Sequence, residues 1–127
     1  MKEREIKEDK IRQWVRMWLS GSCDGIEKLF DKNAYYSESH GPEYHGIAQL
    51  TQWFTDWNTQ NKVTQWEVTS FFHDGQTTVT EWHFEWVHNG RKSNHEGASI
   101  IEWSCDGKIY SIKDFGSVSS HTLPYGV

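Results

Sequence analysis

One carboxylate, Asp114, lies where it could carry acid–base chemistry, and strand register decides what it faces. Read as a two-residue hairpin turn, Asp106-Gly107 places Asp114 opposite Ser99 on the apolar side of a sheet. A carboxylate there loses water, which raises its pKa toward the range of a general base. A slip of one residue would put Lys113 in its place. The alternative is that Asp114 points inward, forms hydrogen bonds with Ser99, Tyr110 or the backbone, and has no catalytic role.

A second carboxylate, Glu38, ends a short expected strand just before a turn that carries His40. The loop could deliver both side chains to a pocket rim, although an exposed loop Glu is the plain alternative. His45 shares this loop and His95 faces the apolar side of the sheet, so these histidines could ligate a metal together with a carboxylate. Their spacing matches no recognised metal or nucleotide motif, and we therefore expect no metal and no cofactor.

The elements that must position these groups follow from hydrophobic periodicity. Apolar residues at helical spacing predict helices over residues 5–19, 25–30 (capped by Asp24) and about 46–60. Alternation predicts a short strand over 34–37 and longer strands over 63–73, 77–88, 92–104 and 108–118. Helices followed by an antiparallel meander predict the α+β class, with three N-terminal helices packed on one face of a curved, mainly antiparallel sheet.

The turns allow a test of register, because pairing must keep one face apolar. A two-residue turn at Asn89-Gly90 pairs Trp82 with Gly97, Phe84 with His95, and Trp86 with Ser93. The turn at Asp106-Gly107 pairs Trp103 with Tyr110, Ile101 with Ile112, and Ser99 with Asp114. A three-residue, bulged turn over 74–76 is expected, since it pairs Val68 with Trp82 and Trp66 with Phe84.

Eight tryptophans in 127 residues are many for a small core, and indoles are well suited to the wall of a cavity for a flat or apolar ligand. Plain core packing is the alternative for any one of them. The residues expected to line such a cavity are Trp14, Tyr36, Trp53, Trp57, Trp82, Phe84, Trp86, His95, Trp103 and Tyr110.

Length and composition limit the class of protein. The length fits one domain, residues 1–127. The formal net charge of −5 and the lack of a basic stripe argue against nucleic acid as a partner. We expect no membrane span, because no apolar run is long enough, and no signal peptide, because the first residues are charged. Cys23 and Cys105 are expected to be free thiols, and the expected location is cytoplasmic.

The outer face of the sheet is expected to be polar, with His83 opposite Glu96 and two exposed apolar residues, Phe71 and Ile100. This composition is typical of a wet interface between subunits. We therefore expect a homodimer formed through the outer sheet face.

The order of motifs resembles the nuclear transport factor 2-like superfamily, and within it the SnoaL-like group that includes polyketide cyclases and ketosteroid isomerase. The resemblance covers almost the whole chain and rests on Trp14-Val-Arg-Met-Trp-Leu, Cys23-Asp-Gly-Ile-Glu-Lys-Leu-Phe, Asn33-Ala-Tyr-Tyr-Ser, Tyr44-His-Gly-Ile, Glu81-Trp-His-Phe, Asn89-Gly-Arg-Lys, Glu96-Gly-Ala-Ser-Ile-Ile and Cys105-Asp-Gly-Lys-Ile-Tyr-Ser-Ile-Lys-Asp-Phe. It implies a cone-shaped α+β barrel with a pocket between helices and concave sheet, usually dimeric.

The resemblance transfers ketosteroid-isomerase roles only in part. The general base falls on Glu38, the oxyanion-binding Tyr falls on Trp14, and the oxyanion-binding Asp falls on Ser99. Loss of an oxyanion donor costs about 2.7–4 kcal/mol of barrier lowering, so efficient steroid isomerisation is not expected. The inward acid of SnoaL-like cyclases has its nearest equivalent in Asp114.

The expected function is binding of an apolar, cyclic small molecule. If the protein is an enzyme, the resemblance and the acids favour cofactor-free isomerase, cyclase or dehydratase chemistry. Asp114 or Glu38 would be the base, and His40, Ser99 or Tyr36 would donate to the oxyanion. A non-catalytic ligand-binding or dimerisation module of the same fold is the alternative.

Overall fold

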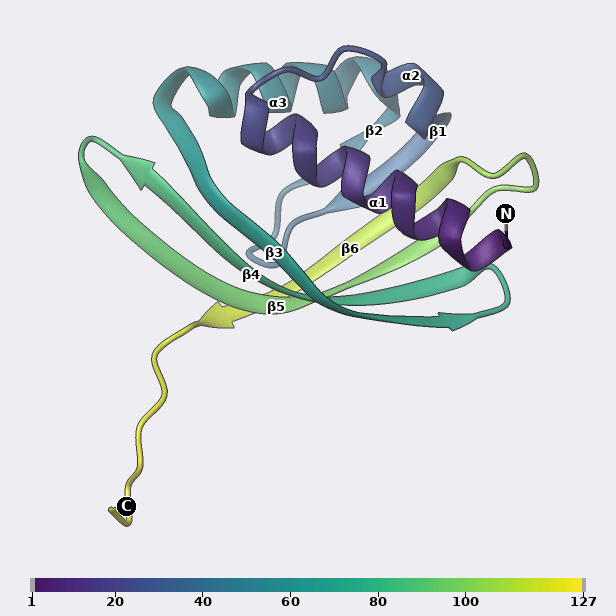
Figure 1. Ribbon diagram of the computed structural model, residues 1–127. Coiled ribbons are helices and arrows are strands. Elements are labelled where there is room, and N and C mark those ends of the chain that lie inside the picture. Colours follow the sequence, from purple (N-terminus) through teal and green to yellow (C-terminus); the bar gives the residue numbers. More distant parts are fainter. Residues whose placement is uncertain (1, 127) are drawn as a thin grey trace.

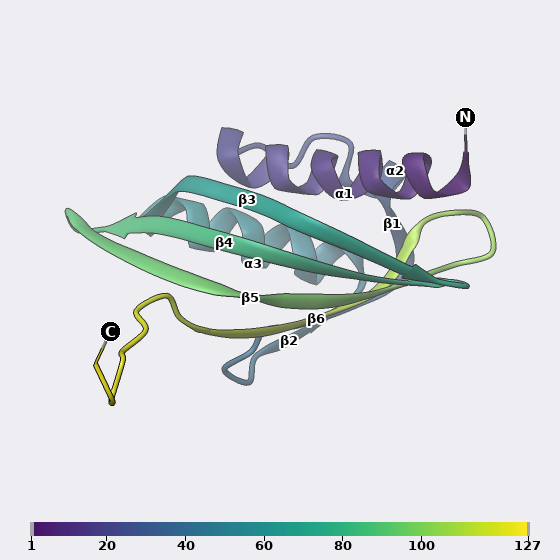
Figure 2. The ribbon, with the colours of Figure 1, turned by 60° about the horizontal axis from the view of Figure 1, so that its bottom comes forward.

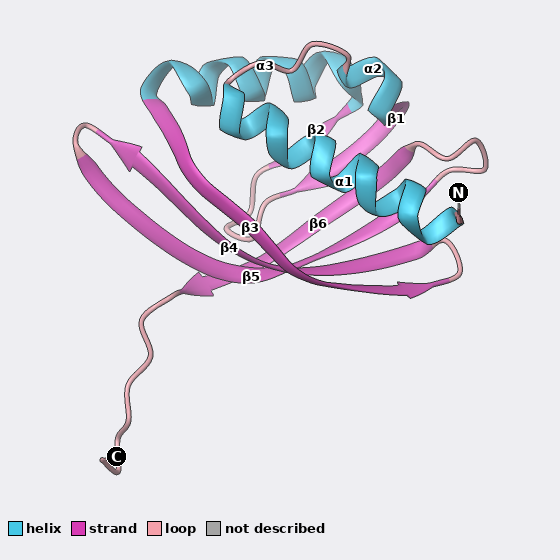
Figure 3. Cartoon of the chain, in the orientation of Figure 1, coloured by secondary structure: helices cyan, strands magenta, loops and turns pink. Residues whose placement is uncertain are grey.

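The computed structural model describes residues 2–126 and shows helices covering the concave face of one curved sheet (Figure 1, Figure 3). In chain order the elements are α1 (Glu3–Ser20), α2 (Ile26–Leu29), β1 (Phe30–Ser37), β2 (Glu43–His45), α3 (Gly46–Gln60), β3 (Asn61–Asp74), β4 (Thr77–His88), β5 (Arg91–Trp103) and β6 (Ile109–Val118). The strand order is β2-β1-β6-β5-β4-β3. The α+β class and the cone shape are confirmed, and Figure 2 shows α1 and α3 on the same side of the sheet.

The helices follow their apolar stripes. In α1, Ile11, Trp14, Val15 and Trp18 are buried at helical spacing. Gly21 ends this helix in the left-handed region at φ 77°, and its N–H donates to the Met17 carbonyl. The predicted Asp24 cap of α2 is wrong, because Gly25 holds that position without a side-chain cap and Phe30 already belongs to β1.

The sheet contains the predicted meander and two further pairings. β1 pairs with β6 in parallel, and β2, which the sequence did not predict, pairs with β1 in antiparallel fashion. The register of β4 and β5 is as predicted, with Trp82 opposite Gly97 and Phe84 opposite His95. Because that register holds, the indoles of β4 face the helices.

The β3–β4 hairpin reaches its predicted register by a different route. Val68 does pair with Trp82, but Asp74 pairs with Thr77, and the irregularity lies in the strand, between Val68 and Ser70. The three-residue bulged turn is therefore wrong. The bulge also turns Phe71 inward against the core, so its predicted exposure is wrong, and it is Phe72 that is exposed on the outer face.

The β5–β6 connection differs from the predicted turn, and the prediction that Tyr110 lines the cavity is wrong. Ser99 pairs with Asp114 and Ile101 with Ile112, as predicted, but a register shift after Glu102 pairs Trp103 with Ile109. A five-residue loop over 104–108 replaces the predicted two-residue turn. As a consequence Tyr110 is 48 % exposed and does not face the concave side.

Two paired glycines lie directly against the Trp82 indole. Gly97 of β5 and Gly116 of β6 are paired. A Cβ at Gly97 would lie 2.2 Å from the Phe115 carbonyl oxygen and 2.9 Å from Cη2 of Trp82. Only glycine allows this close approach of backbone and indole.

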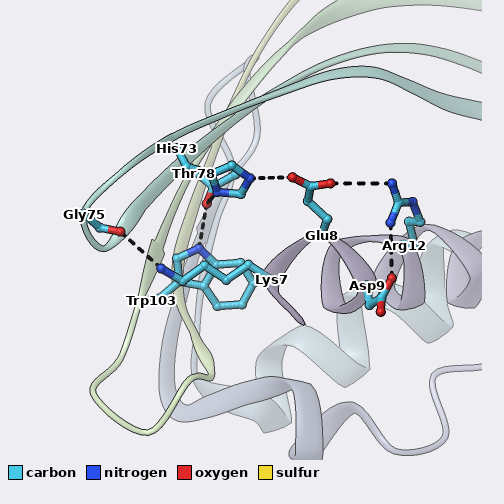
Figure 4. A network of polar contacts seen from close by, with 8 residues as sticks. All are labelled: Lys7, Glu8, Asp9, Arg12, His73, Gly75, Thr78 and Trp103. Carbon is cyan, nitrogen blue, oxygen red and sulfur yellow. Dashed lines mark hydrogen bonds and ion pairs between the residues drawn. The ribbon is translucent and has the colours of Figure 1, made fainter. Parts of the chain in front are cut away.

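A polar network joins α1 to the β3–β4 hairpin (Figure 4). Thr78 Oγ1 accepts from Trp103 Nε1 (2.9 Å) and donates to His73 Nδ1 (3.0 Å), and His73 Nε2 donates to Glu8 Oε2 (2.7 Å). Lys7 Nζ donates to the carbonyl of the hairpin turn (3.1 Å). Because Thr78 is fully buried, the network fixes the first half of α1 over the sheet.

The core is one hydrophobic cluster between the helices and the concave face. Cys23 and Cys105 are free thiols. In residues 2–126 we find no helix with the length and apolar character that a membrane crossing requires.

Candidate functional site

Asp114 is the centre of a hydrogen-bonded group on the concave face. Tyr36 Oη donates to Asp114 Oδ2 (2.5 Å), and Ser99 Oγ donates to Asp114 Oδ1 (2.6 Å). Trp82 Nε1 in turn donates to Ser99 Oγ (2.9 Å). Each carboxylate oxygen therefore has one hydroxyl donor, and the carboxyl group is held in a fixed orientation.

Three adjacent strands bring these side chains together. Ser99 and Asp114 are direct cross-strand partners on β5 and β6. Tyr36 comes from β1, where it pairs with Ile112, two residues before Asp114 and on the same face of β6. The predicted Ser99–Asp114 pairing is confirmed. The second hydroxyl comes from Tyr36 and not from Tyr110, the tyrosine that the predicted register had offered.

The environment raises the pKa of Asp114 to about 6. Burial is the largest cause, and the charge of Glu38 adds to it, while the hydrogen bonds from Ser99 and Tyr36 act in the opposite direction. Burial and the nearby Asp114 hold the pKa of Tyr36 well above its usual range. Tyr36 therefore remains a neutral donor, and Asp114 titrates close to neutral pH.

Glu38 follows directly after β1, in a loop closed by backbone hydrogen bonds. Its N–H donates to the Pro42 carbonyl (2.9 Å), and its own carbonyl accepts from Gly41 N–H (3.2 Å). Tyr44 Oη donates to Glu38 Oε2 (2.7 Å), and the Tyr44 ring stacks on Trp53 at 4.5 Å. Burial, followed by the hydrogen bond to Glu38, raises the pKa of Tyr44. The loop thus presents Glu38 to the same space that Asp114 faces.

That space consists of two cavities, here called inner and outer, that share five lining residues. The inner cavity has a volume of about 80 Å³ and is lined by Trp18, Tyr36, Glu38, Trp53, Trp57, Trp66, Trp82, Phe84 and Asp114. The outer cavity has a volume of about 550 Å³ and is lined by Glu38, Ser39, His40, Trp57, Trp82, Phe84, Trp86, His95, Asp114, Gly116, Ser117 and Val118. Glu38 and Asp114 line both cavities, so a ligand in either one can contact a carboxylate.

The structure places most of the predicted site residues at these cavities. The ones that line the inner or the outer cavity are Tyr36, Glu38, His40, Trp53, Trp57, Trp82, Phe84, Trp86, His95 and Asp114. Ser99 is buried behind Asp114. Trp14 and Trp103 are core residues: Trp14 packs on Phe30 at 4.8 Å, and Trp103 is bonded to Thr78.

Three residues of the site were missed by the sequence reasoning. Trp18 lies on the predicted apolar stripe of α1, and the predicted register pairs Trp66 with Phe84 on the inner face. Both positions therefore contain enough information to predict that these residues line the cavity. Tyr44 lies in the unpredicted strand β2 and gave no such signal.

The indole N–H groups of the site differ in whether they form a hydrogen bond. Trp82 Nε1 is bonded within the acid group, whereas the buried Nε1 atoms of Trp18 and Trp66 have no hydrogen-bond partner within residues 2–126. A buried donor without a partner costs about 1–3 kcal/mol. These two indoles therefore contribute aromatic surface to the site and not polar contacts.

A metal site is not formed by the candidate histidines. Within residues 2–126, no group of three or more His, Cys, Asp or Glu side chains is close enough to hold a metal ion. His45 contacts Glu43 at 3.3 Å, outside both cavities. What the site offers chemically is a partly buried carboxylate held by two hydroxyls, a second carboxylate and an aromatic wall.

Comparison with known proteins agrees with this architecture. Residues 11–112 match the family described as the SnoaL-like domain, and the chain belongs to this family. Among curated proteins, none matches the sequence significantly.

Solved structures share the fold. An LEH-like epoxide hydrolase from M. tuberculosis superposes with a TM-score of 0.79 at 11% identity, covering 89% of this chain and 84% of that one. A protein from Catenulispora acidiphila with a ketosteroid isomerase-like fold, solved in complex with trimethylamine, gives 0.76 at 18% identity and 87% coverage of both chains. The epoxide hydrolase/cyclase-like enzyme SalBIII, with a role in pyran ring formation in salinomycin, gives 0.77 at 18% identity, covering 92% and 95%. At these identities the likeness shows the fold alone.

Proposed function

We propose that this protein binds an apolar, cyclic small molecule in the aromatic cavities and moves a proton on it without a cofactor, as an isomerase, cyclase or dehydratase. The observation that carries the proposal is the Asp114 carboxylate, held by two hydroxyls at the wall of a ligand-sized space. A general base works best when its pKa lies near the operating pH, and the pKa of Asp114 is raised to about 6.

We assign separate roles to the polar groups. Asp114 accepts the proton from a carbon next to a carbonyl. The hydroxyls of Ser99 and Tyr36 are already committed to Asp114, so they orient the base and do not serve the oxyanion. His40 and His95 line the outer cavity and are the donors for the developing oxyanion.

The aromatic wall supports this chemistry physically. Trp57, Trp82 and Phe84 line both cavities. A ring that packs against them displaces water from Asp114 and is held in one orientation. The second carboxylate, Glu38, is turned toward the same space by Tyr44 and is the alternative base.

Isotope exchange tests the proposal without knowledge of the natural substrate. A panel of cyclic ketones, including 2-tetralone, is incubated with the protein in D₂O, and loss of the α-protons is followed by NMR. We expect ketones that quench tryptophan fluorescence on binding to exchange faster with the protein, and Asp114→Asn to reduce this gain by about 10²–10⁴-fold. Glu43→Gln, an exposed carboxylate outside both cavities, is the matched control.

Undiminished exchange in the Asp114→Asn variant would show that Asp114 is not the base. Binding without any exchange would favour the second candidate, a non-catalytic ligand-binding module. The inner cavity, at about 80 Å³, is smaller than the roughly 300–1,000 Å³ of usual ligand pockets. This observation favours the dimerisation form of the non-catalytic module, in which the protein's own aromatic rings fill the cone.

We also propose that a second copy of this chain covers the outer sheet face. Phe72, Val79 and Ile100 are successive cross-strand partners there, and Phe115 is 55 % exposed beside them on β6. The segment after β6 leaves the body of the molecule with a fully exposed Tyr125 (Figure 1). Sedimentation at micromolar concentration should give a dimer that Phe115→Glu dissociates, and a monomeric parent protein would contradict the proposal.

A further inference from the structure

We infer that the ligand of this site carries a cationic amine, held in the inner cavity by aromatic rings and two carboxylates. The inference deepens the proposed function and rests on it, because it names the charge of the molecule that the same cavities bind. It follows from the composition of the wall, the lack of counter-charge and the volume of the inner cavity.

The inner wall has the composition that cations prefer. Six of its members are Trp or Phe, namely Trp18, Trp53, Trp57, Trp66, Trp82 and Phe84. Five of these rings form a connected set. Trp18 lies 5.0 Å from Trp53 and 5.2 Å from Trp57. Phe84 lies 6.3 Å from Trp57 and 5.6 Å from Trp66. The negative ring faces of several aromatic residues attract ammonium groups, and trimethylammonium recognition uses such enclosures.

The two carboxylates of the site lack a positive partner. Among the described residues 2–126, no Lys or Arg lines either cavity, and neither Glu38 nor Asp114 forms an ion pair. Their hydrogen-bond partners are the neutral hydroxyls of Tyr36, Ser99 and Tyr44. Close carboxylates without counter-charge repel one another, and a cation between them removes that repulsion.

The volume fits a small cationic head. One water needs roughly 10–15 Å³ of such space, so about 80 Å³ accommodates roughly five to eight water-sized groups. A trimethylammonium group with its first methylene has this size. The apolar body of the ligand would then lie in the outer cavity, against Trp86 and His95, whose rings are 4.9 Å apart.

The test compares two probes of equal shape that differ in charge, phenyltrimethylammonium and tert-butylbenzene. Their dissociation constants are measured at pH 8 by quenching of tryptophan fluorescence. We expect the cation to bind at least tenfold more tightly than the neutral probe. Glu38→Gln and Asp114→Asn should each bring this ratio toward one, whereas the control Glu43→Gln, outside both cavities, should keep it.

Each outcome decides something. A ratio near one in the parent protein overturns the inference and leaves the proposed apolar site standing. A tenfold preference that survives in both Glu38→Gln and Asp114→Asn also overturns it, since the cation would then be held elsewhere. If neither probe binds up to its solubility limit, the apolar pocket itself is wrong, and the proposed function falls together with the inference.

Discussion

Replacing Asp114 by Asn should change how the stability of the protein depends on pH. The folded protein raises the pKa of this carboxyl from an ordinary value of 3.8 to about 6. Between these two values the folded state binds more protons at this site than the unfolded state. The contribution of Asp114 to the free energy of unfolding is therefore fully present below about pH 4 and is lost as pH rises through about pH 6. Asn cannot titrate, so the variant lacks this loss.

The size of the effect follows from the same two pKa values. One pKa unit corresponds to 1.36 kcal/mol, so a rise from 3.8 to about 6 sets an upper limit of about 3 kcal/mol. Asp114 is only partly buried and keeps contact with the cavity, where water screens its charge. We therefore expect the difference in unfolding free energy between variant and parent to change by about 1–3 kcal/mol between pH 4 and pH 7.5.

Urea unfolding, followed by far-UV circular dichroism at several pH values, measures this difference directly. Groups that do not interact with Asp114 titrate alike in both proteins and cancel in the subtraction. The variant should gain stability relative to the parent as pH rises, with most of the change below about pH 6. A difference that stays constant from pH 4 to pH 7.5, or one that moves in the opposite direction, would show that folding does not raise the pKa of Asp114.

Three further substitutions test the surroundings of the site. Tyr36→Phe removes a hydrogen bond to the charged Asp114, worth about 1.5–3 kcal/mol; NMR titration should show the pKa of that carboxyl raised by about one to two, and an unchanged value would contradict its role. Thr78→Val removes the hydroxyl that accepts the hydrogen bond of the buried Trp103 indole N–H. Urea unfolding should show that the free energy of unfolding falls by about 1–3 kcal/mol, and the control Thr77→Val should lower it less. Gly97→Ala forces a Cβ against the neighbouring strand and should lower the free energy of unfolding by about 1–3 kcal/mol or more. An unchanged melting temperature would contradict the close approach.

Local patterns account for what the sequence could predict. The Asn89-Gly90 turn and the alternation of β4 fix the register of Trp82 and Phe84, because a slip would expose the indoles. Strand alternation also predicts that Asp114 lies opposite Ser99, and this pairing is present although the predicted two-residue turn at Asp106-Gly107 is a longer loop. The register of β5 and β6 therefore follows from the alternation of the strands and not from the turn.

Long-range pairing accounts for what the sequence could not predict. The parallel pairing of β1 with β6 brings Tyr36 to Asp114 across 78 positions of the chain, and no turn signals it. The bulge between Val68 and Ser70 exchanges the faces of Phe71 and Phe72 without any glycine or proline to mark it. The strand β2, which carries Tyr44, has only three residues, too few for a periodic pattern.

The proposed chemistry depends on a desolvated carboxylate that two hydroxyls hold at the wall of the ligand cavity. The most direct measurement is the pH titration of the Asp114 side-chain carboxyl by carbon-13 NMR, assigned by comparison with Asp114→Asn. We expect a midpoint at about 6. A midpoint near the ordinary value of 3.8 would mean that water reaches this group freely, and it would contradict Asp114 as a base tuned to neutral pH.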